Sequence, residues 1–271
     1  MSKPKIETAG LSPPNIAPEM EALGSYRRAI LFLTLGRGNR GKTMFTRFMA
    51  QRAVEAGRPP ILADADRTNA SLTRFFPNAL SPTSADDAAV TALFSQIVEE
   101  QAATGRNAAI DLGAGDVVLK RAAREMALTA WLPTIGIDPV AVHVVGPSAD
   151  DLSVLQATEN GGLFTPERTI IILNEATVPH GEDPEEAFNA SVRDNPILLA
   201  TVKRGARVIS MPRLAPAEVI AARRLTFTQA ASNVAPPGVE PLGLWKAQQA
   251  AMWVSAMERQ IQDAEIGGWL L

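Results

Sequence analysis

The chain has 271 residues, of which 46% are hydrophobic and 20% are charged, a composition typical of a globular protein. Its formal net charge of −3 argues against a globally basic nucleic-acid-binding protein but leaves a local basic surface open. The absence of cysteine excludes disulfides, thiolate zinc sites and cysteine nucleophiles. The N-terminus lacks a signal-peptide core and no apolar run is long enough to cross a membrane, so we expect a cytoplasmic protein.

The first 25 residues are rich in Pro, Glu and Lys and show little apolar periodicity. We interpret residues 1–25 as a flexible or loosely docked arm. Residues 26–232 are expected to form one domain. Residues 233–271 are expected to form a hinge and a C-terminal helix that packs on or near the same domain.

The clearest motif of the chain lies between residues 29 and 43. Ala-Ile-Leu-Phe-Leu-Thr-Leu predicts a buried strand, and Gly-Arg-Gly-Asn-Arg-Gly-Lys-Thr matches the phosphate-binding P-loop. In a P-loop the backbone N–H groups surround phosphate oxygens, the lysine reaches the β- and γ-phosphates, and the threonine hydroxyl binds Mg²⁺. The candidate nucleotide-binding residues are therefore Gly36, Arg37, Gly38, Asn39, Arg40, Gly41, Lys42, Thr43 and Met44.

The same glycines also fit the dinucleotide motif G-x-G-x-x-G, with Asp64 at roughly the distance of its ribose-binding acid. We favour the P-loop because Lys42 and Thr43 follow the last glycine directly, and the dinucleotide motif does not require that pair. The dinucleotide site stays open as an alternative.

A helix is expected after the loop, with Gly57 as its stop, and residues 61–66 predict a short strand that ends in two carboxylates. This order of strand, loop, helix and strand predicts a parallel sheet. Ligands bind such sheets at the carboxyl ends of the strands, so Asp64 and Asp66 are expected near the phosphates. The alternative is that one of them only caps the following turn.

A second short strand ends at Asp111, and Gly113 and Gly115 follow it. This pattern suits an aspartate that holds the Mg²⁺ shell, followed by a mobile switch. A plain turn aspartate is the alternative. The next elements are a helix over 117–131, a strand over 141–145 and a helix capped by residues 148–151.

The later strands are expected over 169–173 and 207–211, with an acidic helix over 184–192 between them. Asn174 ends the first of these strands, and its amide can recognise a base edge or simply stabilise a turn. The guanine-recognising pattern Asn-Lys-x-Asp is absent after Asn174, which favours ATP over GTP.

Residues 203–224, called the basic segment below, carry six basic side chains against the single Glu218. Six minus one gives +5, which suits either a solvated surface or contact with DNA or a DNA-processing protein. A final helix over about 244–264 carries Trp245, Met252 and Trp253 and is expected to pack on the body of the domain. A dimer contact or weak association with a membrane surface is the alternative for this helix.

These residues resemble the ParA/MinD family of deviant-Walker ATPases over roughly residues 28–225, and within it the plasmid- and conjugation-associated branch of TraL-like and StbB-like proteins. The resemblance implies a three-layer α/β P-loop NTPase fold, with a mostly parallel twisted sheet and a C-terminal helical extension. It further implies binding of ATP or ADP with Mg²⁺, slow ATP hydrolysis, and a homodimer that forms around ATP in partition, conjugation or intracellular positioning.

The resemblance also assigns roles to single residues. The signature lysine that contacts the partner's phosphates corresponds to Arg37, with Arg40 as a second candidate. Lys42 stabilises phosphate charge, and Asp66 corresponds to the aspartate that positions the attacking water. The metal residues are Thr43, Asp111 and Asp64, and the adenine contacts are Asn174 and Pro212. The Pro-Gln that usually follows Asp66 in the family is missing here, as is the usual proline after Asp111.

Two further functions stay open at this point. One is a nucleotide-gated adaptor with little hydrolysis, which binds DNA or a protein complex through the basic segment. The other is a P-loop kinase or ligase that acts on a small molecule.

Overall fold

The computed structural model describes residues 28–67, 70–113, 117–162 and 164–271, so the expected N-terminal arm lies outside the described residues. Six runs of mostly apolar residues form one parallel sheet in the order β2-β3-β1-β4-β5-β6. These strands are β1 (Ala29–Leu35), β2 (Ile61–Ala65), β3 (Ala108–Leu112), β4 (Ile137–Val145), β5 (Arg168–Asn174) and β6 (Arg207–Met211). Nearly all residues of β1 to β5 are buried, as expected when helices cover both faces of a parallel sheet, whereas the edge strand β6 is buried only at Ile209 and Met211.

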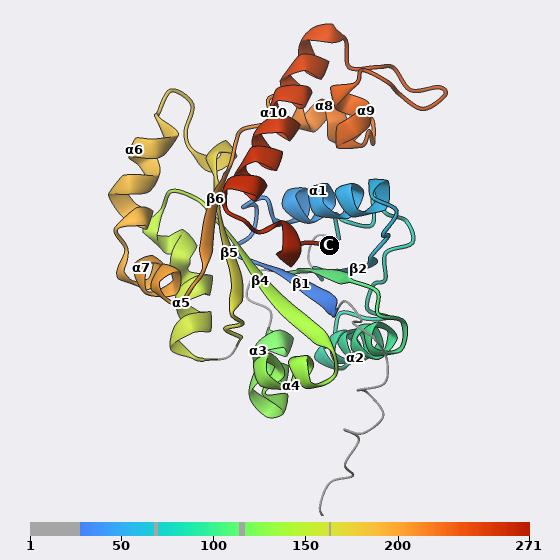
Figure 1. Cartoon of the computed structure of the whole chain (residues 1–271). Coiled ribbons are helices and arrows are strands. Elements are labelled where there is room, and N and C mark those ends of the chain that lie inside the picture. The colour runs from blue at the N-terminus through green and yellow to red at the C-terminus, as the bar shows by residue number, and fades with distance from the viewer. Residues whose placement is uncertain (1–27, 68–69, 114–116, 163) are drawn as a thin grey trace, which may run out of the picture.

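Helices cover both faces of the sheet and make a three-layer α/β fold (Figure 1). One face packs on α1 (Lys42–Glu55), α8 (Ala217–Ala222), α9 (Phe227–Ala231) and α10 (Leu244–Asp263). The other packs on α2 (Asp87–Thr104), α3 (Val117–Met126), α4 (Leu128–Thr134), α5 (Ser153–Asn160), α6 (Pro184–Phe188) and α7 (Pro196–Lys203). All the loops that follow the strands at their carboxyl ends therefore meet along one edge of the sheet.

Two predicted elements of the central region are wrong in their bounds. The single helix expected over 117–131 is two helices, because Ala127 takes a left-handed conformation (φ 48°) and turns the chain so that Leu128 and Leu132 are buried. The strand expected over 141–145 begins earlier, at Ile137, and includes Pro139. Proline is tolerated there because β5 pairs with β4 only from Val140 onward.

The region after β5 also differs from the prediction. The acidic helix expected over 184–192 ends at Phe188 and continues as a π-helical turn (Asn189–Arg193). The short helices α7, α8 and α9 were not predicted, since segments of five to eight residues carry little helical periodicity.

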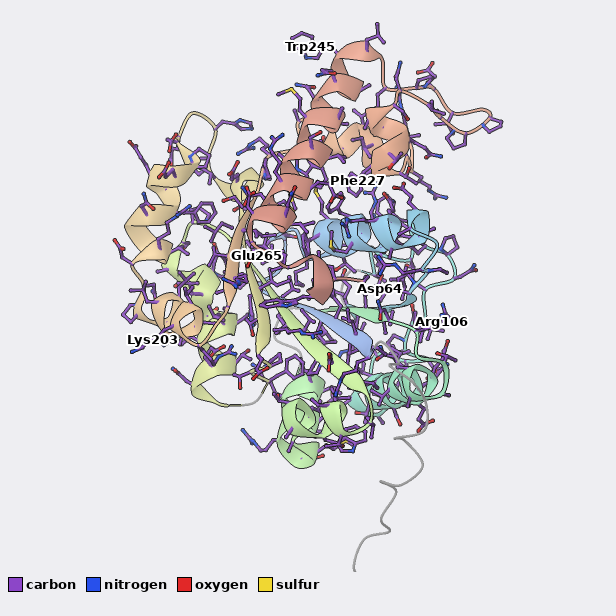
Figure 2. The ribbon with its side chains drawn as sticks, viewed as in Figure 1. Asp64, Arg106, Lys203, Phe227, Trp245 and Glu265 are labelled. Carbon is purple, nitrogen blue, oxygen red and sulfur yellow. The ribbon has the colours of Figure 1, made fainter. Side chains whose placement is uncertain are left out.

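The C-terminal helix α10 lies within one residue of its predicted bounds and packs on the sheet side through Trp253, Met257 and Ile261. Trp245 and Met252 were expected on this packing face, but they are 81% and 65% exposed, which corrects that expectation. Figure 2 shows Trp245 at the end of α10 that lies away from the sheet. No helix in the described part of the chain combines the length and apolar character needed to cross a bilayer.

An aromatic cluster joins α1 to the C-terminal helices. The guanidinium of Arg47 lies 3.6 Å from the ring centroid of Phe75 and 4.8 Å from that of Phe227. Burial lowers the pKa of Arg47 to about 10. Phe227 also stacks on Trp253 with ring centroids 5.0 Å apart. The Trp253 indole Nε1 donates a hydrogen bond of 2.8 Å to the carbonyl of Pro212, so α10 is attached to the end of β6.

Candidate functional site

The loop between β1 and α1 has the backbone of a phosphate-binding loop. Gly36, Asn39 and Gly41 have φ values of 141°, 59° and 92°. Positive φ values of this kind are typical of loops whose backbone N–H groups surround an anion. A Cβ added at Gly41 would lie 2.5 Å from the Asn174 side-chain nitrogen, so only glycine fits there. Among the described residues no side chain caps the first turn of α1, so its backbone N–H groups are suited to bind an anion.

Lys42 lies at the start of α1 and is only 5% exposed. Its Nζ donates a hydrogen bond of 3.2 Å to the carbonyl of Arg37, so the ammonium group reaches back over the loop. Burial lowers the pKa of Lys42, while the negative charges of Asp111 and Asp66 act in the opposite direction. A buried cation that reaches back over such a loop is suited to a phosphate oxygen.

Two hydroxyls and one carboxylate meet beside Lys42. Thr43 Oγ1 donates to Asp111 Oδ2 at 2.5 Å and lies 2.9 Å from Ser71 Oγ. Burial raises the pKa of Asp111 to about 6, although its hydrogen bond with Thr43 and the charge of Lys42 lower it in part. Ser71 was not among the predicted residues, because it belongs to no motif and its contact with Thr43 spans 28 residues.

The donors around Thr43 fit Mg²⁺, which prefers a few protein oxygens completed by phosphate and water. Within the described ranges there is no group of three or more His, Asp or Glu side chains that could hold a metal. Asp111 and the hydroxyl of Thr43 are therefore suited to hold Mg²⁺ together with a nucleotide, rather than as a site built from protein alone.

Asp64 lies in β2 and is 1% exposed. Its Oδ2 accepts hydrogen bonds from the backbone N–H groups of Leu72 and Thr73 at 2.8 and 3.1 Å, which matches the turn-capping alternative. Burial raises the pKa of Asp64, although these backbone hydrogen bonds lower it in part. This environment counts against the dinucleotide alternative, since a buried carboxylate occupied by the following loop is not offered to a ribose. Its role as a metal residue stays a prediction.

Asp66 follows β2 and is partly buried. Its Oδ1 lies 3.4 Å from the position that a Cβ of Gly113 would take, so Asp66 lies against the end of β3, next to the Asp111 region. Gly115, the other glycine of the expected switch, lies outside the described residues. The structure therefore brings Lys42, Thr43, Asp66 and Asp111 to the same edge of the sheet.

The two arginines of the loop contact an acidic pair after β4. Arg40 Nε lies 2.5 Å from Asp151 Oδ1, and Arg37 Nη1 lies 3.9 Å from carboxylate oxygens of both Asp150 and Asp151. Residues 148–151 form a capping box at the N-terminus of the 3₁₀ helix η1 (Ala149–Leu152), as the cap prediction required. The sequence predicts only the helix cap for Asp151, and not its contact with Arg40.

The predicted base-contacting residues make contacts of their own. Asn174 Nδ2 donates to the carbonyl of Arg40 at 2.8 Å, and Asn174 Oδ1 accepts from Ala176 N at 3.0 Å, so the amide holds both the loop and a turn. The carbonyl of Pro212 is bonded to Trp253. Met44 lies in the first turn of α1 and packs partly buried against the core. Their contact with a base stays a prediction.

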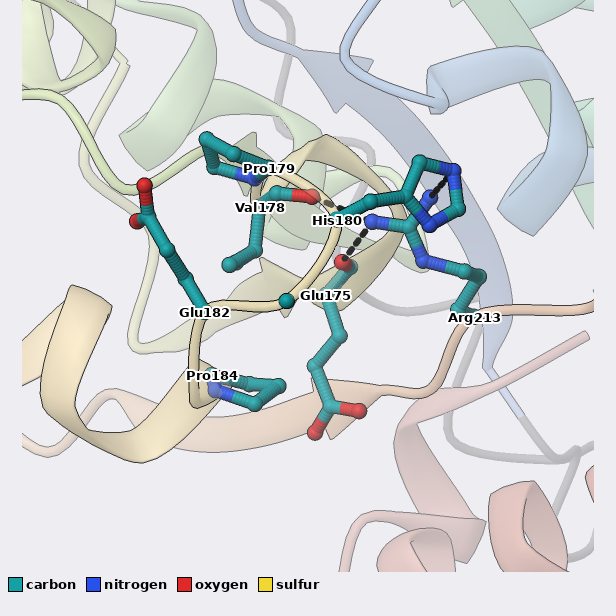
Figure 3. A pocket seen from close by; sticks show the side chains of 8 residues that line it. Glu175, Val178, Pro179, His180, Glu182, Pro184 and Arg213 are labelled. Atoms are coloured by element: carbon teal, nitrogen blue, oxygen red, sulfur yellow. Dashed lines mark hydrogen bonds between the residues drawn. The ribbon is translucent and has the colours of Figure 1, made fainter.

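A cavity of about 100 Å³ is lined by residues that follow β5 and β6 in the sequence, among them Glu175, His180 and Arg213 (Figure 3). Figure 3 shows Arg213 reaching between His180 and the backbone carbonyls of Glu175 and Val178. Burial, with the charge of Asp183, raises the pKa of the Glu175 carboxyl. The sequence does not predict a cavity here, because its lining residues come from two separate loops and form no motif.

Most cations of the basic segment are bound within the chain. Arg204 pairs with Glu159 at 2.6 Å, and the other paired arginines of the segment contact carboxylates or carbonyls: Arg207, Arg213 and Arg223. Lys203 and Arg224 are exposed and make no ion pair or side-chain hydrogen bond with the described residues. The charge count of the segment therefore overstates its free positive surface.

Comparison with known proteins finds no matching family model and no matching curated protein. Among solved structures, MinD of Aquifex aeolicus has a TM-score of 0.48 and 14% identity over 85% of this chain and 97% of that chain. MinD of Pyrococcus horikoshii OT3, complexed with Mg-ADP, has a TM-score of 0.48 and 16% identity over 88% and 98%. Chloroplast FtsY of Physcomitrella patens has a TM-score of 0.45 and 14% identity over 87% of this chain and 66% of that chain.

These identities and TM-scores are too low to carry a functional assignment. The class of the protein is instead defined by its own features: a six-stranded parallel sheet covered on both faces, with a G-x-x-x-x-G-K-T loop between β1 and α1. The chain has the three-layer α/β fold of a P-loop protein, extended by a C-terminal helix.

Proposed function

We propose that the chain is a nucleotide-dependent switch of the ParA/MinD type, which binds ATP or ADP with Mg²⁺, dimerises around ATP and hydrolyses it slowly. The observation that carries this proposal is the contact of 2.5 Å between Thr43 Oγ1 and Asp111 Oδ2, beside the buried ammonium group of Lys42. A loop with the P-loop pattern thus lies beside a hydroxyl and a carboxylate whose chemistry suits Mg²⁺.

The phosphates would be held by backbone N–H groups of residues 36–44, by the N-terminus of α1 and by Lys42. Thr43 and Asp111 would hold Mg²⁺. When bound, Mg²⁺ supplies positive charge that neutralises the phosphate oxygens. Thr43 can donate its proton to Asp111 and keep a lone pair for the metal, which is the orientation observed between these two side chains.

Hydrolysis would depend on positioning and on electrostatic stabilisation. Asp66 would accept a proton or a hydrogen bond from the attacking water, since its carboxylate lies at the same edge of the sheet as Lys42 and Asp111. Arg37 would contact phosphates across the dimer. The base would lie near Asn174 and Pro212. A role in DNA partition, conjugation or intracellular positioning, with a DNA-processing partner, follows from the resemblance alone.

The direct test measures binding and assembly in sequence. Calorimetry with Mg²⁺ should detect binding of ADP, and light scattering should show a dimer with a non-hydrolysable ATP analogue but a monomer with ADP. If no purine nucleotide releases or absorbs heat with the folded protein, the proposal is wrong. The melting temperature with NAD in place of ADP tests the dinucleotide alternative, because a ligand that binds the folded state raises it.

The role of Asp66 has its own test. The Asp66→Ala variant should bind ATP and dimerise normally but should stop hydrolysis, because the loop, Lys42 and the metal residues remain in place. Release of labelled phosphate measures this directly, and transfer of the label to a small molecule would instead indicate a kinase or ligase. Normal hydrolysis by Asp66→Ala would remove Asp66 from the mechanism.

A further inference from the structure

The carboxylate of Asp151 lies where the phosphate-binding loop meets the end of β4. It is 1% exposed, and its two oxygens have different partners: Oδ1 lies 2.5 Å from Arg40 Nε, and Oδ2 accepts from Ser148 N at 3.4 Å. A Cβ added to Gly146 would lie 2.4 Å from Asp151 Oδ2. The chain after β4 thus leaves room for this carboxylate only because residue 146 is glycine.

Arg40 is held at two points, one on its side chain and one on its backbone. Its guanidinium is bound to Asp151 after β4, and its carbonyl accepts from Asn174 Nδ2 at the end of β5. The loop is therefore attached to two neighbouring strands of the sheet through one residue. A displacement of Arg40 would move the peptide groups on either side of it, which are the groups that would face the phosphates.

Arg37 is held much more loosely. Its guanidinium lies 3.9 Å from Asp150 and from Asp151, and its side chain is 44% exposed, compared with 29% for Arg40. A buried carboxylate that loses its only counterion carries a large energetic penalty. Because Arg40 stays on Asp151, the departure of Arg37 leaves no unpaired buried charge.

We propose that Asp151 is a positioning residue that holds the phosphate-binding loop through Arg40 and thereby leaves Arg37 as the arginine that can turn toward a phosphate. The proposal rests on the proposed function, since it assumes that the loop binds a nucleotide. It separates the two candidate arginines: Arg40 is the fixed counterion of Asp151, and Arg37 is the mobile cation.

The first experiment compares two isosteric variants by calorimetry with ADP and Mg²⁺. Asp151→Asn should weaken ADP binding by about tenfold, the scale of a lost charge-assisted hydrogen bond. Asp150→Asn is the matched control, because Asp150 is the neighbouring aspartate but its side chain is 85% exposed, and it should change the affinity less than about twofold. Equal affinity in Asp151→Asn and the unchanged protein would overturn the proposal alone. Absence of ADP binding by the unchanged protein would overturn the proposed function and this proposal together.

The second experiment separates the two arginines by stability. Arg40→Ala should lower the melting temperature by about 5 °C or more, because it leaves Asp151 buried without its close counterion, and adding Asp151→Asn should recover most of that loss. Arg37→Ala should leave the melting temperature within about 1 °C and should abolish the ATP-dependent dimer. Arg40→Ala should also weaken ADP binding, and Arg40→Lys, which keeps the charge, should weaken it less. A melting temperature lowered by Arg37→Ala but not by Arg40→Ala would overturn the assignment.

Discussion

The arginines of the phosphate-binding loop and those of the basic segment have the same chemistry but lie in different surroundings. Arg37 and Arg40 face one carboxylate pair beside the candidate phosphate-binding loop, where a new anion can compete for the loosely held Arg37. Arg204, Arg213 and Arg223 instead hold distant loops together through carbonyls and carboxylates. The comparison teaches that the position of a cation relative to free N–H groups, and not the local charge count, marks the candidate anion site.

The largest expected effect comes from removing one lysine from each region. Lys42→Ala should weaken ADP binding by more than about a hundredfold, since it removes a buried cation that would contact the phosphates. Lys203→Ala removes the same group from an exposed position and should leave the affinity unchanged. Calorimetry on both variants measures the difference, and a similar loss in both would end the distinction between the two regions.

The next effect is one of stability. Arg204 bonds to Glu159, to the carbonyl of Pro166 at 2.7 Å and to Thr169, so Arg204→Ala should lower the free energy of unfolding by about 2–3 kcal/mol. Arg224→Ala, on an exposed side chain of the same segment, should change it by less than about 0.5 kcal/mol. Urea unfolding compares them. A loss of DNA or nucleotide binding without a loss of stability in Arg204→Ala would contradict a structural role.

The affinity for ADP in the presence of Mg²⁺ should depend on pH through the ionisation of the Asp111 carboxyl. Burial raises the pKa of Asp111 to about 6, so below that pH the carboxyl is increasingly neutral and a poorer partner for Mg²⁺. The gain in ADP affinity on adding Mg²⁺ should therefore fall by up to about tenfold per pH unit below pH 6 and level off above it. Asp111→Asn should remove this dependence, while the protonation of ADP itself remains in both proteins.

The same shift has the opposite sign for folding without a ligand. A carboxyl whose pKa is raised on folding stabilises the folded state below its unfolded pKa, and this contribution is lost as the pH rises through about 6. The contribution of Asp111 to the stability of the nucleotide-free protein should thus fall as the pH rises from about 4 to about 6. The Asp111→Asn variant should lack this fall. Urea unfolding between pH 4 and pH 7 measures it.

The smallest expected effect concerns DNA. If all six cations of the basic segment contacted phosphates, the logarithm of the binding constant would fall with the logarithm of salt with a slope of about −5. In the segment, only Lys203 and Arg224 lack an ion pair or side-chain hydrogen bond to the described part of the chain, so we expect a slope no steeper than about −2. Fluorescence anisotropy with duplex DNA at several salt concentrations distinguishes these values. If a variant with Lys203 and Arg224 both replaced by Gln binds DNA as well as the unchanged protein, the basic segment is not the DNA-binding surface.

The fold was predictable where the local pattern and the global structure agree. β1 and β5 are bounded by glycine or charged residues and β6 ends before Pro212, so the predicted positions of these three strands were confirmed within a residue. The break at Ala127 was not predictable, since alanine favours helix and the turn is imposed by burial of Leu128 and Leu132. The strand predicted over 141–145 is too short, since β4 begins at Ile137 and includes Pro139.

The candidate site was predictable only in its local part. The loop residues form a motif in consecutive positions, and Asp111 ends a recognisable strand. Ser71 and Asp151 were missed because their contacts with Thr43 and Arg40 span 28 and 111 residues. A short sequence pattern does not contain such pairs, and only the packing of the strands brings them together.

The attachment of Trp253 to Pro212 gives this protein an intrinsic optical reporter. Its indole is stacked on Phe227 and bonded to the carbonyl at the end of β6, so a shift of that strand end would change the emission of Trp253 without an attached dye. The chain has four tryptophans, and Trp245, which is 81% exposed, provides a solvent-quenched reference on the same helix. Time-resolved emission could therefore follow events at β6 in the unlabelled protein.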